Sequence, residues 1–166
     1  MLGEALSVAT ALLWAASTIL SAEALKEIDP LSANIFKTFF SAVSMLPIAF
    51  AMGEIHNMSK VSLYGLLSVI FAVMIGFGVG DTFLFESITL IGVSRSYTIA
   101  YTYPLFTMAL ATLFVGEPFL LKYLLGTVVI FLGIITILTN KNSDDAKDSS
   151  KGLLEAFATA ISWSVA

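Results

Sequence analysis

Long apolar stretches separated by short polar clusters run along the whole chain. Three uninterrupted stretches, Ala5–Ala22, Val61–Gly80 and Ser96–Gly116, each approach or exceed the roughly 18 apolar residues that indicate a membrane-spanning helix. The pattern predicts an all-α integral membrane protein with five spanning helices. Their expected limits are about Gly3–Ala24, Leu31–Met52, Val61–Thr89, Val93–Val115 and Phe119–Leu138.

Polar segments set the limits of these helices. Asp29-Pro30 suits the start of the second helix, because proline is tolerated in the first helical turn. The third span is expected to be one long helix, although Asp81 and Glu86 lie in its second half, because the apolar character continues to Ile91. Residues 140–151 are polar apart from Ala146, which is typical of a linker in water.

The end of the chain repeats its beginning. The pattern G-x5-A-T-A-x2-W starts at Gly3 and again at Gly152, so that Trp14 corresponds to Trp163 at a constant offset of 149 residues. Five of fifteen aligned positions are identical, which favours an internal repeat over chance similarity among small apolar residues. Because five spans lie between the copies, and five is odd, the second copy must enter the membrane from the opposite face.

This repeat predicts the domain organisation. Residues 1–139 form a first five-helix repeat, 140–151 the linker, and 152–166 the start of a second, inverted repeat. Ala166 falls inside an apolar helical pattern, where a free carboxylate would be costly in a bilayer, so we expect a cut chain. Two such units would give about 300 residues and ten helices.

Composition narrows the function classes. Apolar residues make up 58% of the chain, only 12% are charged, and the mean hydropathy is +0.94. The net charge of −4 argues against nucleic acid, and the absence of cysteine excludes disulfides and thiolate metal sites. Glu4 precedes the first apolar run without Lys or Arg, which disfavours a signal peptide. His56 stands alone in a polar turn, and we expect neither metal nor cofactor there.

Two carboxylates inside the third span are the leading site candidates. Asp81 and Glu86 follow a glycine-rich stretch in which Gly76 and Gly80 form a GxxxG face that allows close helix approach. Ionisable residues within a membrane are rare and by default indicate function, here cation recognition or proton-coupled exchange. The alternative is that the helix ends near Gly80 and Asp81 caps the next segment.

Four further residues could line a substrate path. Lys37 either reaches the headgroups along its aliphatic stem, or turns inward to pair with a carboxylate or an anionic substrate. Tyr97 and Tyr101 share a helix face, and Pro104 frees a backbone carbonyl one turn earlier. That face either lines a cavity or belongs to an interfacial aromatic belt. Trp14 divides in the same way between a pocket wall and ordinary packing.

The remaining marked positions have structural explanations. Gly126 and Gly133 lie seven residues apart on one face of the fifth helix, where helix packing explains them. Glu117-Pro118 ends the fourth span as a turn and helix start.

Together these motifs resemble the EamA-type domain of the drug/metabolite transporter superfamily, over nearly the whole chain. Further support comes from the opening Gly3–Trp14 helix, from Asp29-Pro30, and from Lys37, where the family often has arginine. The residues that carry the resemblance are Gly92-Val93-Ser94-Arg95-Ser96, Tyr103-Pro104-Leu105-Phe106, Gly116-Glu117-Pro118, Gly126 and Gly133.

The resemblance implies ten helices in two inverted repeats, a central cavity and export or exchange of a small metabolite. It also implies that Glu117-Pro118 is a structural signature. Asp81 and Glu86 are not part of the general family pattern, which places them among candidate specificity determinants. The family usually has cytoplasmic termini, whereas counting Lys and Arg in the loops favours the opposite orientation. We follow the resemblance and expect a multi-pass protein of the cell membrane with a cytoplasmic N-terminus.

These observations favour a secondary transporter that works by alternating access. Its expected partners are the lipid bilayer, a small-molecule substrate and a coupling proton or ion, with no cofactor. No phosphate-binding loop of P-loop spacing is present, which disfavours a primary pump. Two alternatives stay open: a five-helix half that works as an antiparallel dimer, and an integral-membrane enzyme that uses Asp81 and Glu86 as a carboxylate pair.

Overall fold

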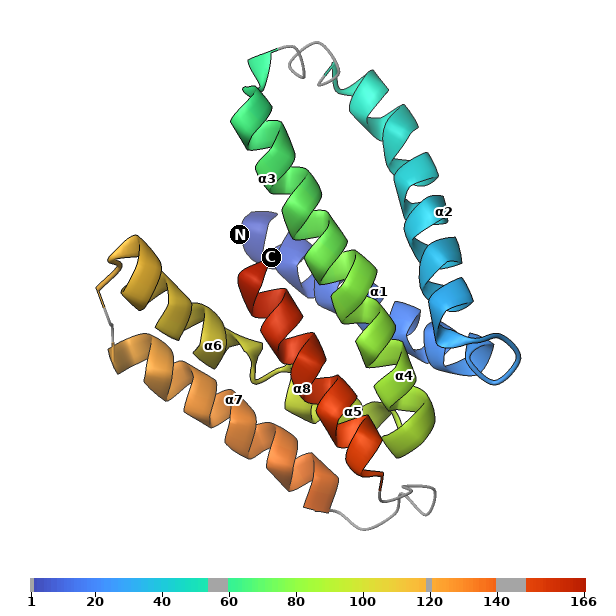
Figure 1. Ribbon diagram of the computed structural model, residues 1–166, viewed down its shortest axis with the longest axis vertical. Coiled ribbons are helices and arrows are strands. Elements are labelled where there is room, and N and C mark those ends of the chain that lie inside the picture. The colour runs from blue at the N-terminus through green and yellow to red at the C-terminus, as the bar shows by residue number, and fades with distance from the viewer. Residues whose placement is uncertain (1, 54–59, 119–120, 140–148) are drawn as a thin grey trace.

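The computed structural model describes residues 2–53, 60–118, 121–139 and 149–166, and every regular element in these ranges is helical (Figure 1). Four continuous helical stretches in this part of the chain are long and apolar enough to cross a membrane: Gly3–Ala24, Pro30–Ala51, Leu63–Ile91 and Val93–Val115. The elements are α1 (Leu2–Ala24), α2 (Pro30–Ala51), α3 (Leu63–Val73), the π-helix η2 (Met74–Gly80), α4 (Asp81–Ile91), α5 (Val93–Ala100), α6 (Tyr103–Leu110), the π-helix η3 (Ala111–Val115), α7 (Leu121–Thr139) and α8 (Ser150–Val165).

The third predicted span is confirmed as one continuous helix, formed by α3, η2 and α4. The fourth is continuous in length but divided into α5 and α6 at Tyr101 and Thr102. Pro104 explains the division, because its ring excludes the i−4 carbonyl and it has no N–H to donate. The fifth predicted span corresponds to α7, and its expected start at Phe119 lies outside the described residues. The five-helix count and the inverted second repeat stay predictions.

Side-chain caps fix where two of these helices begin. Asp29 accepts a hydrogen bond from the backbone N–H of Ser32 at 3.0 Å, and Pro30 occupies the first turn of α2. This hydrogen bonding to Ser32 lowers the pKa of the Asp29 carboxyl. Ser149 caps α8 in the same way, by accepting from the N–H of Gly152 at 3.2 Å. The second copy of the repeated motif therefore begins a helix, as the first does.

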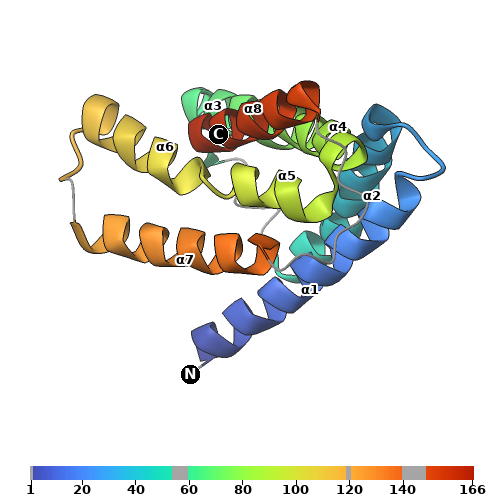
Figure 2. The same cartoon turned by 90° about the horizontal axis from the view of Figure 1, so that it is seen from below.

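Helix α8 packs along α4 and η2, and α5 and α6 lie between it and α7 (Figures 1 and 2). Glycines allow this close approach. A Cβ atom on Gly152 would lie 2.6 Å from Ile91 Cγ2, and one on Gly80 would lie 2.9 Å from Trp163 Cδ1. A Cβ on Gly76 would lie 2.8 Å from the side chain of Ala166. Helix α8 and the residue after it thus pack directly against Gly76 and Gly80, the two glycines of the GxxxG face.

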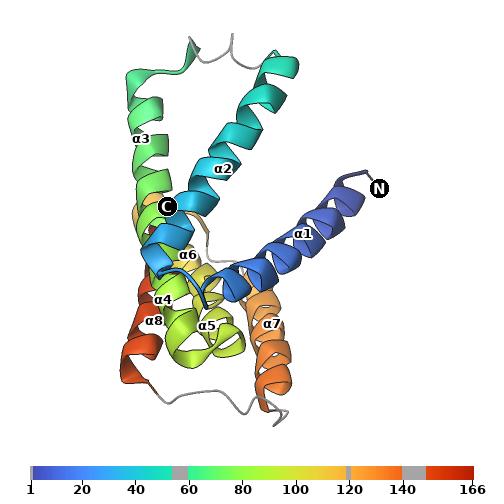
Figure 3. The same cartoon turned by 90° about the vertical axis from the view of Figure 1, so that its right-hand side faces the viewer.

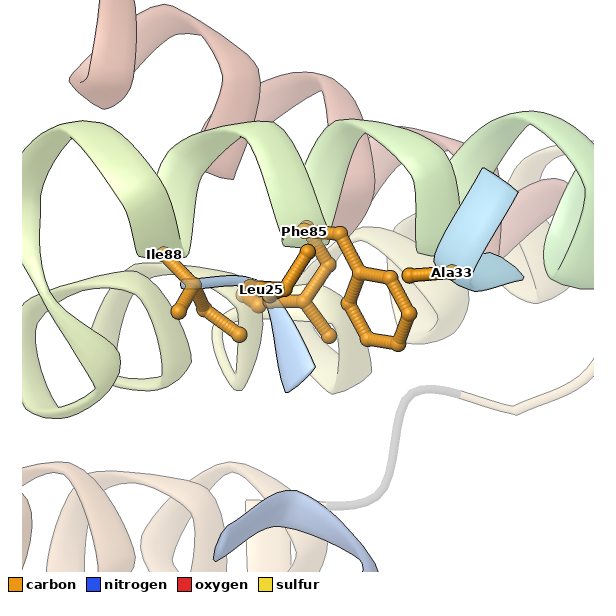
Figure 4. Close-up of a cluster of buried hydrophobic side chains, with 6 residues drawn as sticks. Leu25, Ala33, Phe85 and Ile88 are labelled. Atoms are coloured by element: carbon orange, nitrogen blue, oxygen red, sulfur yellow. The ribbon is translucent and has the colours of Figure 1, made fainter. Parts of the chain in front are cut away.

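A small apolar cluster joins α1, α2 and α4 at one end of the bundle. Phe85 and Ile88 project from α4 toward Leu25 and Ala33 (Figure 4). From this end α1 and α2 diverge (Figure 3), and their outer faces are apolar and exposed. Large exposed apolar faces on helices of this length indicate surfaces that contact lipid or further membrane helices. The chain is therefore a multi-pass membrane protein.

Candidate functional site

Asp81 is a charged residue in the interior of the helix bundle, with 3% of its surface exposed. One carboxylate oxygen, Oδ2, forms an ion pair with the Nζ atom of Lys37 from α2. The other, Oδ1, accepts a hydrogen bond from Trp163 Nε1 of α8 at 2.8 Å. The helix is continuous through this position, and the caps described above are made by other residues, so the interpretation of Asp81 as a helix cap is wrong. Its carboxylate instead connects α2 and α8 to α4.

Lys37 turns inward rather than toward the headgroups. Its ammonium nitrogen lies 5.2 Å from the centroid of the Phe85 ring and 6.0 Å from that of Phe77, distances typical of cation–π contacts. The Lys37 side chain is 27% exposed, whereas that of Asp81 is 5% exposed. The pair is therefore asymmetric, with a buried carboxylate and a more accessible ammonium.

Side chains of neighbouring helices form hydrogen bonds with backbone carbonyls of the π-helix η2, which precedes Asp81. A π-helix shifts the backbone pairing from i−4 to i−5 and leaves carbonyls to be satisfied by other donors. Asn34 Nδ2 lies within hydrogen-bond distance of Phe77 O at 2.7 Å and of Gly78 O at 3.0 Å. Thr159 Oγ1 donates to Gly80 O at 3.1 Å. Asn34 is a site residue that the apolar pattern does not single out, although its place three residues before Lys37 puts both on one face of α2.

A cavity of about 380 Å³ opens beside Asp81. Its wall is mostly aromatic, and the rings of Tyr101 and Tyr103 lie 6.5 Å and 5.7 Å from that of Trp163, centroid to centroid. Both tryptophans of the repeated motif face this cavity, one from α1 and one from α8. The lining residues are Trp14, Gly76, Phe77, Asp81, Tyr101, Tyr103, Trp163 and Ala166. We call this space the aromatic cavity.

The other predicted tyrosine takes a different position. The hydroxyl of Tyr97 lies 2.9 Å from Thr18 Oγ1 of α1, and its ring centroid is 5.4 Å from that of Tyr101. Tyr97 thus links α5 to α1 and does not line the aromatic cavity, whereas Tyr101 is part of its wall. Pro104 stands at the start of α6, where it sets the direction of the helix that carries Tyr103.

A second cavity, of about 440 Å³, lies between α1 and α2. Lys37 and Phe85 line it together with apolar residues of α1 such as Leu13 and Leu20. We call it the α1–α2 cavity. Lys37 belongs to this cavity and Asp81 to the aromatic cavity, so the ion pair stands between the two spaces.

Glu86 does not join Asp81. Five residues along an α-helix turn the side chain by about 140°, so the two carboxylates leave the helix on different faces. Glu86 instead accepts from Lys151 Nζ of α8 at 3.2 Å, and Lys151 also lies 3.9 Å from Glu155. The hypothesis of an Asp81–Glu86 carboxylate pair is therefore wrong, and with it the arrangement on which the enzyme alternative depended.

The remaining predicted positions lie away from the cavities. No described atom comes within 4 Å of a Cβ placed on Gly126 or Gly133, so the packing expected of them is not seen. Glu117 and Pro118 are exposed and follow Gly116, whose φ of +75° ends the preceding helix. His56 lies outside the described residues. Among the described residues, no group of three or more His, Cys, Asp or Glu side chains is placed to hold a metal ion.

Comparison with known proteins places these features in a family. The model of the EamA-like transporter family matches residues 1–139. An uncharacterized transporter from Archaeoglobus fulgidus is 27% identical over 166 residues, which is all of this chain and 57% of that protein. The chain thus spans little more than half the length of the curated relative it matches. A search of solved structures found no significant match.

Proposed function

This chain belongs to the EamA-like transporter family, and we propose that it is a secondary transporter that moves a small metabolite across the cell membrane by alternating access. The observation that carries the proposal is the aromatic cavity with the carboxylate of Asp81 in its wall. A volume near 380 Å³ lies in the range of small-molecule sites, which are mostly apolar with a few placed polar groups.

The depth of Asp81 supports a role in transport. Asp81 stands ten residues before the end of the Leu63–Ile91 span, or about 15 Å along the helix axis at 1.5 Å per residue. With Ile91 taken as the membrane boundary, the carboxylate would lie near the middle of a bilayer whose hydrocarbon core is about 30 Å thick. A buried charge at such depth is costly to keep and is normally retained for a substrate or ion path.

We further propose that α1 and α8 are equivalent helices of two inverted five-helix repeats. Trp14 and Trp163 stand at corresponding positions of the shared motif and line the same cavity, which supports the proposal that both repeats contribute matching helices to one site. In this proposal residues 1–139 form the first repeat, 140–151 the linker, whose last two residues already belong to α8, and 152–166 the start of the second. The N-terminus is cytoplasmic, and transport is coupled to a proton or another ion.

An antiparallel dimer of five-helix units is the alternative assembly. Native mass spectrometry of the full chain in detergent separates the two proposals. A monomer with one cavity per chain supports the ten-helix arrangement, and an obligate dimer supports the paired half-units.

Transport into proteoliposomes tests the function. Purified protein would be screened with amino acids, nucleosides and amines, and the active solute then compared between wild type, Asp81→Asn and the matched control Glu23→Gln. Glu23 is an exposed carboxylate at the end of α1, paired with Lys26. We expect Asp81→Asn to lose most transport and Glu23→Gln to retain it. Unchanged transport in Asp81→Asn would remove this carboxylate from the mechanism.

A further inference from the structure

The aromatic cavity has the chemistry of a cation site. Five of its eight lining residues are aromatic, one is the carboxylate of Asp81, and none is Lys, Arg or His. The faces of aromatic rings carry negative potential and attract cations, and a desolvated setting strengthens this attraction. An anion in the same place would face the ring electrons and the carboxylate together. The wall therefore favours a positively charged solute with an apolar body.

The carboxylate of Asp81 is already paired with a cation, the ammonium group of Lys37. Lys37 approaches Asp81 from the α1–α2 cavity and pairs with Oδ2. This pairing lowers the cost of holding a carboxylate at this depth, since an unpaired buried charge is strongly destabilising. The Lys37 side chain belongs to the protein, so it cannot leave with a solute.

Lys37 has a second favourable contact besides Asp81, the aromatic ring of Phe85. Its ammonium lies close to the ring of Phe85, and both residues line the α1–α2 cavity. At 27% exposure the lysine side chain is much less enclosed than its partner, so it can withdraw along its flexible stem while Asp81 stays fixed by Trp163.

From this arrangement we propose that Lys37 is a tethered cation that holds Asp81 in the empty cavity and yields it to the ammonium group of a small protonated amine. The apolar body of the amine lies between Trp14, Trp163 and Tyr101. The inference rests on the proposed transport function and names its substrate class. When the amine leaves, Lys37 returns to Asp81, so the carboxylate is neutralised in both states.

Binding by three matched probes tests the idea. Phenethylamine, phenethyl alcohol and phenylacetate share a ring and differ in charge, and Trp14 and Trp163 both line the cavity, so a change in tryptophan fluorescence reports occupancy. For the full chain in lipid nanodiscs we expect phenethylamine to bind with much higher affinity than phenethyl alcohol or phenylacetate. If Lys37 is paired with Asp81 in about nine-tenths of the substrate-free molecules, only about one-tenth can bind the amine directly. Removing the lysine in Lys37→Met then tightens amine binding about tenfold. Asp81→Asn abolishes the preference for the amine.

A second variant separates competition from a folding defect. Lys37→Arg places a guanidinium beside the carboxylate, which it can hold through two hydrogen bonds, so amine binding should weaken. Opposite shifts in Lys37→Met and Lys37→Arg support competition, whereas weaker amine binding in both overturns it. Lys26→Met, at an exposed pair, is the control and should leave binding unchanged.

The charge series also separates this inference from the transport proposal. Tighter binding of phenylacetate than of phenethylamine would overturn the amine assignment and indicate that Lys37 contacts an anionic substrate itself. If proteoliposomes carry an anionic or neutral solute in a manner that depends on Asp81, the substrate class is wrong and the transporter stands. If Asp81→Asn changes the transport of no solute, the proposed site fails as well.

Discussion

Replacing single glycines of the π-helix tests the contact between η2 and α8. Gly80→Ala adds a methyl group 2.9 Å from Trp163 Cδ1 and 3.0 Å from Ser162 Cβ, closer than carbon atoms normally approach. Gly78→Ala is the matched control in the same element, because its new methyl group meets only Val73 O, at 4.0 Å. The two variants make the same chemical change and differ only in the space available.

The expected effects have opposite signs. Replacing a helical glycine with alanine stabilises by about 0.5–1 kcal/mol, which is the whole effect expected at Gly78. Overpacking costs about 1–3 kcal/mol, which at Gly80 offsets this gain and leaves a net loss of up to about 2.5 kcal/mol. Because Trp163 must move to admit the methyl group, its hydrogen bond to Asp81 should lengthen or break.

Unfolding of the purified protein in mixed micelles, followed by helical circular dichroism, measures the free energy of unfolding. Tryptophan fluorescence of the folded state reports the surroundings of Trp163. We expect Gly80→Ala to unfold earlier than wild type with a shifted emission, and Gly78→Ala to unfold later with unchanged emission. Equal stability of the two variants would refute the packing of α8 against η2.

Three further predictions follow from the polar contacts. Asn34→Ala leaves Phe77 O without its side-chain donor and Gly78 O with only the hydroxyl of Thr82, and should cost about 1–3 kcal/mol in the same unfolding assay, while Ser68→Ala, at an exposed hydroxyl bonded within its own helix, should change it little. Lys37→Met leaves the buried Asp81 carboxylate unpaired and should cost about 3 kcal/mol, whereas the double variant Lys37→Met/Asp81→Asn recovers much of this loss; equal stability of the single and double variants would contradict the pairing. Glu86→Gln breaks an ion pair in which both side chains are partly exposed and should change the unfolding free energy by less than about 1 kcal/mol; a loss of several kcal/mol would show that this pair holds α8 in place.

The sequence predicts the helices well because each depends on a local pattern. The limits of α1, α2 and the Leu63–Ile91 helix follow from apolar runs and from the Asp29-Pro30 signal. The family follows from short motifs in a fixed order, and the matching family model confirms it. Such features need no knowledge of which helices touch.

The site depends on contacts between helices, and local sequence patterns predict only some of its residues and none of its pairings with certainty of partner. Asp81 stands out as a charge in an apolar run, but its pairing with Lys37 and Trp163 joins residues 44 and 82 positions away. The separation of Asp81 from Glu86 follows from helix geometry alone and could have been worked out from their spacing. The π-helix and its support by Asn34 had only an indirect signal, in the closely spaced glycines of η2.

A transported solute should occupy the space beside Asp81, and protection of an introduced thiol measures this occupancy. Residues 1–166 contain no cysteine, so Tyr101→Cys introduces a thiol in the wall of the aromatic cavity, and Phe114→Cys introduces one on the exposed outer surface of η3; the protein without either substitution is the background control. Labelling with a membrane-permeable thiol reagent would be measured in proteoliposomes with and without the transported solute. We expect the solute to slow labelling of Tyr101→Cys and labelling there to stop transport, and we expect neither effect in Phe114→Cys. Labelling of Tyr101→Cys that the solute does not slow, with transport unchanged afterwards, would contradict the claim that the aromatic cavity is the substrate path.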